Sequence, residues 1–364
     1  MYSVSLVVIG MKLQIAYIVD WKGNPNTGAP QKIQEQISVW RKNGLNVNLY
    51  IITPSKNRNE WAKKTNKVFT YSNFLQRILA RTYCSFTVIR SKDINLVYRR
   101  LAIWEFFELI SIVLKPTVIE INTNNKEYYK KKSSLFWLIY WLQNIFISKY
   151  IVGACSVTEE LKELQSLKIK NKTRVFTNSI KIDSKTVEPV IYTRETAKQS
   201  SFVFLASDAF KWNGVDLLFA LAKSFPKFNF HIVGLKGTDF QNVYWHNPMY
   251  DQDLISFLRT MDFGISTLAI DSLNLKQAAP LKSRTYLANG LPTIGAYEDS
   301  AFDKSDDFFF QIIFDHNSLQ LLNKDDFLNF VKKWSGKKVD LHLLGSINSE
   351  IIEKNRASFI RSLT

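Results

Sequence analysis

Apolar and polar positions in the first half of the chain alternate between strand-like and helix-like patterns. Short apolar, β-prone runs predict strands at residues 13–19, 46–53, 115–124, 148–156 and 173–180. Amphipathic or apolar runs between them predict helices at residues 31–44, 99–114, 134–147 and 157–164, the last with Thr158 as its N-cap. Strands that alternate with helices are typical of a parallel sheet covered on both faces.

The second half repeats this alternation after a polar stretch, residues 181–200, that we interpret as a linker. Strands are predicted at residues 201–207, 227–234, 262–268 and 292–296, and helices at 214–225, 253–261, 282–290 and 348–363. The pattern predicts two doubly wound, Rossmann-like α/β domains that face a cleft, where ligands bind at the carboxyl ends of the strands. We place the domains at residues 1–185 and 186–345, and expect residues 346–364 to cross back to the first domain.

Length and composition agree with two domains and exclude several other classes of protein. The chain has 364 residues, of which 46% are hydrophobic, so two substantial cores are possible. Two cysteines and four scattered histidines give no disulfide framework and no zinc motif, as in a reducing compartment. The first residues lack the features of a signal peptide, and residues 1–10 resemble an upstream-start extension. No apolar run is long enough to predict a membrane-spanning helix.

Basic residues are concentrated in the first half of the chain. Residues 1–185 contain 29 basic and 12 acidic residues, whereas residues 186–364 contain 19 and 20. This excess predicts an anionic partner, such as a phospholipid surface, a diphosphate or a nucleic acid. Lys130, Lys131 and Lys132 precede the aromatic helix 134–147, so we expect these lysines to face a membrane. We expect most aromatic side chains of that helix to be buried, and no nucleic-acid-recognition motif is present.

The stretch "PLKSRTYLANGLPTIG" contains the strongest candidate for phosphate chemistry. Lys282 lies in the first turn of a predicted helix, where the helix dipole already favours an anion. At 3.6 residues per turn, Lys282 shares one face with Thr285, Tyr286 and Asn289, and Arg284 points away. We interpret Lys282 as a ligand of a phosphate or diphosphate group. The alternative is a solvated lysine at the start of a helix.

Five segments in order resemble the family-four glycosyltransferases of the GT-B fold. They are "VTEELKEL", "RVFTNSIKID", "FLASDAFKWNGVDLLFAL", "FHIVG" and "PLKSRTYLANGLPTIG", and the resemblance covers about residues 13–300. The third segment resembles the variant in which Trp-x-Gly replaces the commoner Lys-Gly. The resemblance implies transfer of a sugar from a nucleoside-diphosphate sugar, with retention of configuration and with no required metal or cofactor. It also implies that Lys282 is a catalytic residue, the ligand of the departing diphosphate.

The chain departs from the family pattern at the donor side. The spacing of the family's two glutamates falls on Gln277 and Thr285, which are neutral and lose the charge-assisted bond to the ribose. The family's arginine and lysine fall on Asp208 and Asn213. Lys211 is the cation that remains in this loop, and its side chain either approaches the phosphates or is a surface charge. Gly214 is expected to let the backbone approach the donor closely.

On the acceptor side, Gly28 follows the first strand, where it allows close backbone approach or forms an ordinary strand–helix connection. The family often has a histidine after a later strand, and this chain has none there. Asn122, Asn124 and Glu127 are therefore the candidates for polar contacts at that position.

Together these features predict a cytoplasmic, membrane-associated hexosyltransferase of bacterial surface-polysaccharide synthesis. Its acceptor would be a glycan or a polyprenyl-diphosphate-linked sugar. A catalytically silent GT-B homologue that acts as a scaffold or partner subunit is the alternative, favoured by Gln277 and Thr285. A nucleic-acid-binding protein is a third interpretation, which would require salt-sensitive binding to DNA or RNA.

Overall fold

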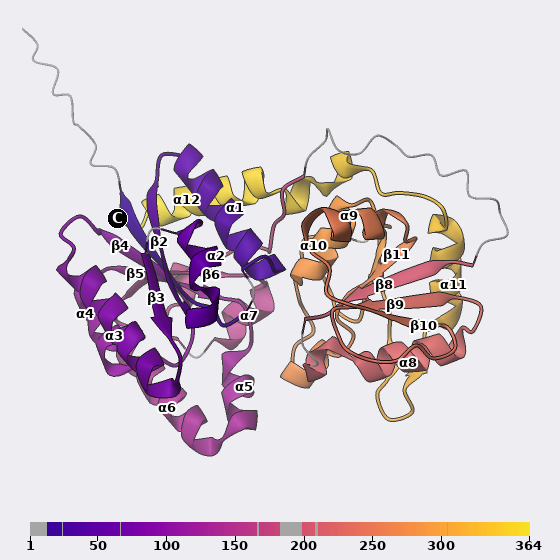
Figure 1. Cartoon of the computed structure of the whole chain (residues 1–364), viewed down its shortest axis with the longest axis horizontal. Helices are drawn as coiled ribbons and strands as arrows, with labels where there is room; N and C mark the ends of the chain where they lie inside the picture. The colour runs from indigo at the N-terminus through magenta and orange to yellow at the C-terminus, as the bar shows by residue number, and fades with distance from the viewer. Residues whose placement is uncertain are drawn as a thin grey trace, which may run out of the picture.

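The computed structural model has two α/β domains, each built on one parallel sheet (Figure 1). It describes residues 13–23, 25–65, 67–165, 167–182, 199–207, 210–303 and 305–364. The proposed extension at residues 1–10, most of the proposed linker and Asp208 lie outside these residues. The predicted fold class, two doubly wound parallel-sheet domains, is confirmed.

The first domain has seven parallel strands in the order β3-β2-β1-β4-β5-β6-β7. The strands are β1 Gln14–Asp20, β2 Asn46–Pro54, β3 Lys67–Tyr71, β4 Leu96–Arg100, β5 Thr117–Ile121, β6 Ile151–Ser156 and β7 Thr173–Val175. The helices are α1 Gly28–Lys42, α2 Arg58–Ala62, α3 Phe74–Arg90, α4 Phe106–Leu114, α5 Asn125–Lys132, α6 Ser134–Ile147 and α7 Glu159–Leu164, with short 3-10 turns η1 Ser55–Asn57 and η2 Lys170–Lys172. Because helices cover both faces, the central strands are buried on both sides.

The second domain has six parallel strands in the order β10-β9-β8-β11-β12-β13. These are β8 Ser201–Leu205, β9 Asn229–Val233, β10 Val243–His246, β11 Phe263–Ile265, β12 Thr293–Gly295 and β13 Phe309–Gln311, followed by the hairpin of β14 Phe314–Asp315 and β15 Gln320–Leu321. The helical elements are η3 Lys211–Asn213, α8 Val215–Ser224, α9 Asp251–Arg259, η4 Ile270–Leu273, α10 Leu281–Ala288, α11 Lys324–Trp334 and η5 Leu341–Ile347.

The last helix, α12 Ser349–Arg361, lies against α1 of the first domain (Figure 1). Trp40 Nε1 donates to Glu353 Oε2 at 3.1 Å, and Arg356 Nη1 lies 3.1 Å from Glu120 Oε1. The buried Glu120 carboxylate also accepts from Lys32 Nζ at 2.7 Å. Burial alone raises the pKa of Glu120, but the cations Lys32, Arg100 and Arg356 outweigh it and hold this pKa well below its ordinary value.

The chain crosses between the domains twice, and the two crossings are paired. The Ile180 N–H donates to the Ile347 carbonyl at 3.0 Å, and the Ser349 N–H donates back to the Ile180 carbonyl at 3.0 Å. The outgoing and returning segments therefore run side by side at the domain junction.

The N-termini of α7 and α4 were both predicted from the sequence. Thr158 is the N-cap of α7, since its Oγ1 accepts from the Leu161 N–H at 3.2 Å. The helix expected at residues 99–114 begins only at Phe106, because Arg99 and Arg100 belong to β4 and a capping box between Glu105 and Glu108 starts α4.

The expectation that most aromatic side chains of residues 134–147 are buried is wrong. Tyr140 is buried, Trp137 is half-buried, and the remaining aromatic side chains of α6 are exposed: Phe136, Trp141 and Phe146. The inward face of α6 instead carries Gln143, whose side chain accepts from the Trp104 N–H at 3.1 Å and donates to the Ala102 carbonyl at 2.6 Å. Two of the four buried residues of α6, Gln143 and Asn144, are polar, and the other two are Tyr140 and Ile147.

Within the described ranges, no helix combines the length and apolar character needed to cross a membrane. Both cysteines, Cys84 and Cys155, are buried and unpaired.

Candidate functional site

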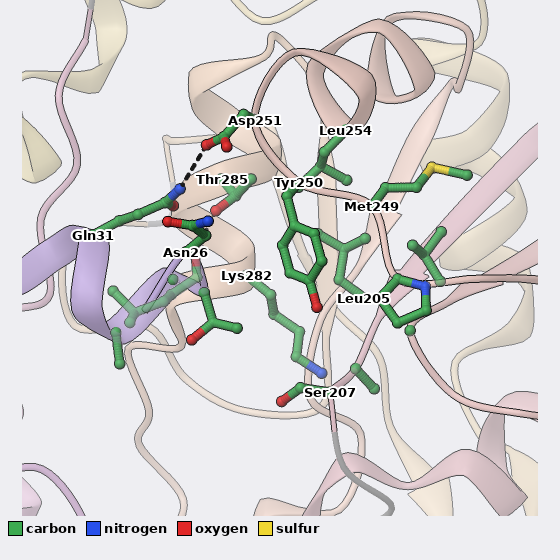
Figure 2. A pocket seen from close by; sticks show the side chains of 18 of the residues that line it. Asn26, Gln31, Leu205, Ser207, Met249, Tyr250, Asp251, Leu254, Lys282 and Thr285 are labelled. Carbon is green, nitrogen blue, oxygen red and sulfur yellow. Dashed lines mark hydrogen bonds between the residues drawn. The ribbon is translucent and has the colours of Figure 1, made fainter. Parts of the chain in front are cut away.

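A cavity of about 1190 Å³ lies between the two domains. The second domain contributes the carboxyl ends of β8 and β9 and the beginnings of α9 and α10, and the first domain contributes the loop before α1 and the first turn of that helix. Figure 2 shows Asn26 and Gln31 on one side, Tyr250 and Leu205 on the other, and Lys282 between them. The cavity is therefore at the strand ends where doubly wound folds bind ligands.

Lys282 projects into this cavity from the first turn of α10. Its Nζ donates to Asn213 Oδ1 at 2.9 Å and lies 4.3 Å from the centre of the Phe204 ring. Burial lowers the pKa of Lys282 to about 7, because its contacts in the cavity are neutral and solvate an ammonium ion less well than water does. A cation held among neutral groups is stabilised strongly by an anionic ligand that binds beside it.

Two other residues of the predicted face of α10 line the same cavity, and one does not. Thr285 and Asn289 line it, and Thr285 Oγ1 donates to the Leu281 carbonyl at 3.1 Å. Tyr286 is instead buried against the sheet, where its hydroxyl donates to the Ile265 carbonyl at 3.0 Å and accepts from the Leu205 N–H at 2.7 Å. Glycine at position 264 leaves the space that the Tyr286 ring fills.

Arg284 points away from the cavity, as its helical position predicts, and is fully buried. It forms an ion pair of 2.6 Å with Asp299 and donates from Nε to the Asn178 carbonyl at 2.7 Å. A further bond of 2.9 Å joins it to Thr177. The segment that enters the second domain is thus bonded directly to the helix that carries Lys282.

The residues of the loop before α8 that face the cavity are not the ones predicted from the sequence. Phe210, Trp212 and Asn213 line it, whereas Lys211 is exposed and lines a separate, smaller pocket. Lys211 therefore matches the surface-charge alternative. Gly214 is not in the lining, but its φ of 70° and its close approach to Leu268 explain why a residue without a side chain stands there.

Gln277 does not line the cavity, contrary to its expected role at the donor site. Its side-chain oxygen accepts from the Glu160 N–H at 3.2 Å, and its own N–H donates to the Glu160 carboxylate at 2.7 Å. Gln277 is thus engaged in a contact between α7 of the first domain and the segment before α10.

On the first-domain side, Gly28 lines the cavity at the start of α1. A side chain added at Gly28 would meet Leu281 Cβ at 3.7 Å, so the first turns of α1 and α10 lie close together. Gln31 Nε2 donates to Asp251 Oδ1 at 3.3 Å, a bond that joins the two domains at one side of the cavity (Figure 2).

None of the three predicted contacts after β5 lines the cavity. Asn122 donates to Glu120 at 3.0 Å, and Asn124 caps α5 and donates to the Leu273 carbonyl of the second domain at 3.1 Å. Glu127 lies in the first turn of α5. The asparagines thus bond within the first domain and to the second, and the residues after β5 lie away from the cavity because β5 is two strands from β1 in the sheet.

The three lysines predicted to face a membrane are all exposed at the end of α5. Lys131 bonds to the Ser272 carbonyl of the second domain, and Lys132 Nζ lies 4.5 Å from the centre of the Phe136 ring. Lys131 therefore also contributes to the contact between the domains.

The sequence prediction missed the wall of the cavity formed before and within α9. Met249, Tyr250 and Asp251 line it, and the Tyr250 side chain points into the cavity (Figure 2). Asp251 has a φ of 47°, which is unusual for a residue other than glycine. The segment "HNPMYDQDL" contains a proline and an acidic helix start, but no feature that indicates a ligand.

Comparison with solved structures identifies this arrangement of two sheets around an interdomain cavity. The chain is similar to a glycosyltransferase from Rickettsia africae ESF-5, with a TM-score of 0.64, 14% identity, and coverage of 97% of this chain and 98% of that chain. The fold is GT-B. Anabaena Alr3699/HepE in complex with UDP and glucose gives a TM-score of 0.64 at 12% identity, covering 96% of this chain and 100% of that chain. The lipopolysaccharide outer core galactosyltransferase WaaB in its apo form gives 0.61 at 15% identity, covering 96% and 99%.

UDP-N-acetylglucosamine 2-epimerases also share the GT-B fold with this chain, at a lower TM-score of 0.53 for the enzyme from Neisseria meningitidis. No protein-family model matches the chain, and comparison with curated proteins gives no match either.

Proposed function

We propose that this protein is a glycosyltransferase that moves a sugar from a nucleoside-diphosphate sugar to a glycan or a lipid-linked acceptor. The observation that carries the proposal is Lys282, which projects from the first turn of α10 into the interdomain cavity and is held there by the neutral Asn213. A GT-B neighbour that holds UDP and glucose supports a nucleotide-sugar donor.

The diphosphate would lie at the start of α10. A helix N-terminus and a lysine ammonium both stabilise negative charge, and the charge on the diphosphate grows as the bond to the sugar breaks. Pro280 at the N-cap has no side chain that could bond to the first N–H groups of this helix. Lys282 would therefore stabilise the leaving group without a metal ion or another cofactor.

The remaining lining residues suit the other parts of a donor. Thr285 and Asn289 lie one and two turns beyond Lys282 and offer a hydroxyl and an amide to the ribose. Tyr250 and Met249 give an aromatic and apolar wall for a nucleobase. Gly28 and Asn26, from the first domain, lie on the side from which an acceptor hydroxyl would approach.

In the proposed reaction, the bond between the anomeric carbon and the diphosphate oxygen breaks. The acceptor hydroxyl oxygen forms the new bond to that carbon and releases its proton. We expect retention of configuration. Proton NMR of the first product formed shows its anomeric configuration directly. Bacterial surface-polysaccharide synthesis at the inner face of a membrane is the setting that we propose, and one GT-B neighbour is a lipopolysaccharide outer core galactosyltransferase.

Thermal unfolding with a panel of nucleoside diphosphates tests the donor site. A ligand that binds only the folded state raises the unfolding midpoint, so the matching nucleotide should stabilise the wild-type protein. The Lys282→Ala variant should lose this stabilisation, and the Lys211→Ala variant should keep it because Lys211 lies outside the cavity.

A catalytically silent GT-B homologue is the second candidate. The observation that favours it is the loss of two charged residues of the family pattern: Thr285, whose Oγ1 is bonded to the Leu281 carbonyl, stands where that pattern has glutamate, and Asn213 stands where it has lysine. Failure of every nucleotide to stabilise the protein would favour this candidate. Conversion of one UDP-sugar into another in the absence of an acceptor would instead indicate an epimerase.

A further inference from the structure

Three neighbouring helices of the first domain, α3, α4 and α6, present their large apolar side chains to the surface. Six of these side chains have between 64% and 72% of their surface exposed: Phe74, Leu75, Leu79, Tyr83, Phe106 and Leu135. In α6, eight of the 14 residues are exposed large hydrophobic residues. We call the exposed apolar side chains of α3, α4 and α6 the apolar face.

The outward sides of these helices are at least as apolar as their inward sides. In α3 the buried residues are Ala80, Cys84, Ser85 and Val88, in α4 they are Glu108, Ser111 and Ile112, and in α6 they are Tyr140, Gln143, Asn144 and Ile147. A surface helix usually carries polar residues on its outward side, whereas the outward sides of these three helices are mostly apolar. Large apolar side chains exposed on three adjacent helices indicate contact with an apolar medium or partner.

The apolar face is continuous across the three helices. The Phe86 ring of α3 lies 4.8 Å from the Phe107 ring of α4, and α4 in turn contacts α6. Figure 1 shows α3, α4 and α6 together along the edge of the first domain, on the side of the sheet opposite α12 and α1. The exposed residues therefore form one surface and are not scattered singly.

The charges around the apolar face distinguish between its potential occupants. The three helices contain one acidic residue, Glu108, which is buried and paired with Arg81 and Arg99. Cations lie beside the aromatic rings at the rim: Lys132 near Phe136, Lys149 4.8 Å from the Tyr150 ring and Arg90 6.0 Å from the Phe86 ring. A cationic rim around an apolar centre matches anionic headgroups above acyl chains.

We propose that the apolar face inserts into the interfacial region of an anionic lipid bilayer. A second copy of the chain would bring two cationic rims together, which is unfavourable. Trp141, Tyr83 and Tyr128 are exposed aromatic residues of the kind that prefer the boundary between headgroups and acyl chains. The lysines of α5 thus form part of the rim, and the apolar residues of the three helices form the inserted surface.

Bilayer contact on this side also positions the interdomain cavity. Helix α5 directly precedes α6, and its Asn124 cap and Lys131 bond to carbonyls of η4 in the second domain. A protein docked by α6 therefore holds the domain junction near the membrane surface. The use of a lipid-linked acceptor depends on the proposed function, whereas the docking of the protein to a bilayer does not.

Flotation of the full chain with lipid vesicles tests the docking. Vesicles of phosphatidylcholine and phosphatidylglycerol in equal parts should carry the wild-type protein upward, and vesicles of phosphatidylcholine alone should carry less. The variant with Leu79→Ser, Phe106→Ser and Leu142→Ser removes one apolar side chain from each helix. Its partition coefficient for the mixed vesicles should fall about 100-fold, since each lost side chain, partly buried in the interfacial region, contributes about fivefold.

A matched control removes one phenylalanine and two leucines that are equally exposed elsewhere: Phe240→Ser, Leu322→Ser and Leu343→Ser. This control should bind vesicles like the wild type. Replacement of Lys130, Lys132 and Lys149 by glutamine should remove most of the preference for mixed vesicles, about 100-fold, and leave the weaker binding to phosphatidylcholine.

The proposal is overturned if the wild-type protein does not float with the mixed vesicles, or if both serine variants lose binding equally. It is also overturned if the first serine variant changes only the oligomeric state, measured by light scattering, because a second copy then covers the apolar face. Nucleotide stabilisation of the serine variants, measured without vesicles, reports on the donor site alone. A failure of docking is therefore separable from a failure of the proposed function.

Discussion

The pKa of Lys282 makes a quantitative prediction about ligand binding. Burial lowers this pKa to about 7, so above pH 7 the side chain is largely neutral in the ligand-free protein. A bound diphosphate favours the ammonium form, and binding must then take up a proton. The last ionisation of a phosphate monoester lies near pH 6, so the ligand itself does not change charge above pH 7. The affinity should therefore fall about tenfold per pH unit between pH 7 and the pKa of the complex.

Calorimetry measures this effect in two independent ways. Titration with the nucleoside diphosphate that stabilises the protein most gives the affinity at pH 7, 8 and 9, and paired buffers of different ionisation enthalpy give the proton uptake. At pH 8 we expect about one proton to be taken up per ligand bound. In the Lys282→Met variant the uptake and the pH dependence should both disappear, whereas Lys211→Met should retain them.

Affinity that is independent of pH, with no proton uptake at pH 8, would refute the assignment of Lys282 to the diphosphate.

The stability of the ligand-free protein gives a second test of the lowered pKa of Lys282. Between pH 7 and the ordinary lysine pKa of 10.5 the unfolded state binds more protons than the folded state, so this group makes stability rise with pH. The Lys282→Met variant should lack that rise.

Three further predictions concern the scaffold. Glu120→Gln leaves Lys32 buried without its counter-charge and Arg356 with Glu353 alone, and should lower the free energy of unfolding by about 3–5 kcal/mol; a loss below about 1 kcal/mol in urea would contradict the described role of this carboxylate. Gly214→Ala places a Cβ 2.8 Å from Leu268 at a φ of 70° and should cost about 1–3 kcal/mol; an unchanged midpoint in calorimetry would count against it. Burial lowers the pKa of His231 to about 4, so this group makes stability fall as pH drops from 6.5 to 4, and His231→Phe should flatten that part of the stability profile measured by urea unfolding.

Much of the fold was predictable because its signals are local. Apolar runs bounded by glycine, proline and polar residues mark most of the strands, and helical periodicity placed Lys282, Thr285 and Asn289 on one side of α10. The same periodicity could not separate Tyr286 from this face, because a glycine on the neighbouring strand β11 opens the space that its ring occupies.

Features that depend on partners distant in the sequence were not predictable. Strand β4 contains the buried Arg99, which pairs with Glu108, and the half-buried Arg100, which pairs with Glu120. Helix α6 looks like a core helix in sequence, but its buried positions include Gln143, which bonds to the loop before α4, and most of its aromatic side chains are exposed.

The wall of the cavity that carries Tyr250 was missed for a similar reason. This residue lies in a loop whose position depends on the neighbouring strands and on α9, and one sequence gives no signal for it. Gln277 was misplaced because spacing to a family pattern cannot reveal its contact with Glu160.

The release of nucleoside diphosphate from a panel of nucleotide sugars tests the proposed function most directly. The wild-type protein and the Lys211→Ala control should release it at similar rates with the matching donor, in the presence of a lipid-linked or glycan acceptor. Lys282→Ala should reduce the rate by about 100-fold or more, as the loss of a group that stabilises the leaving charge predicts. Equal rates for Lys282→Ala and the wild type, or no release from any donor, would contradict the account.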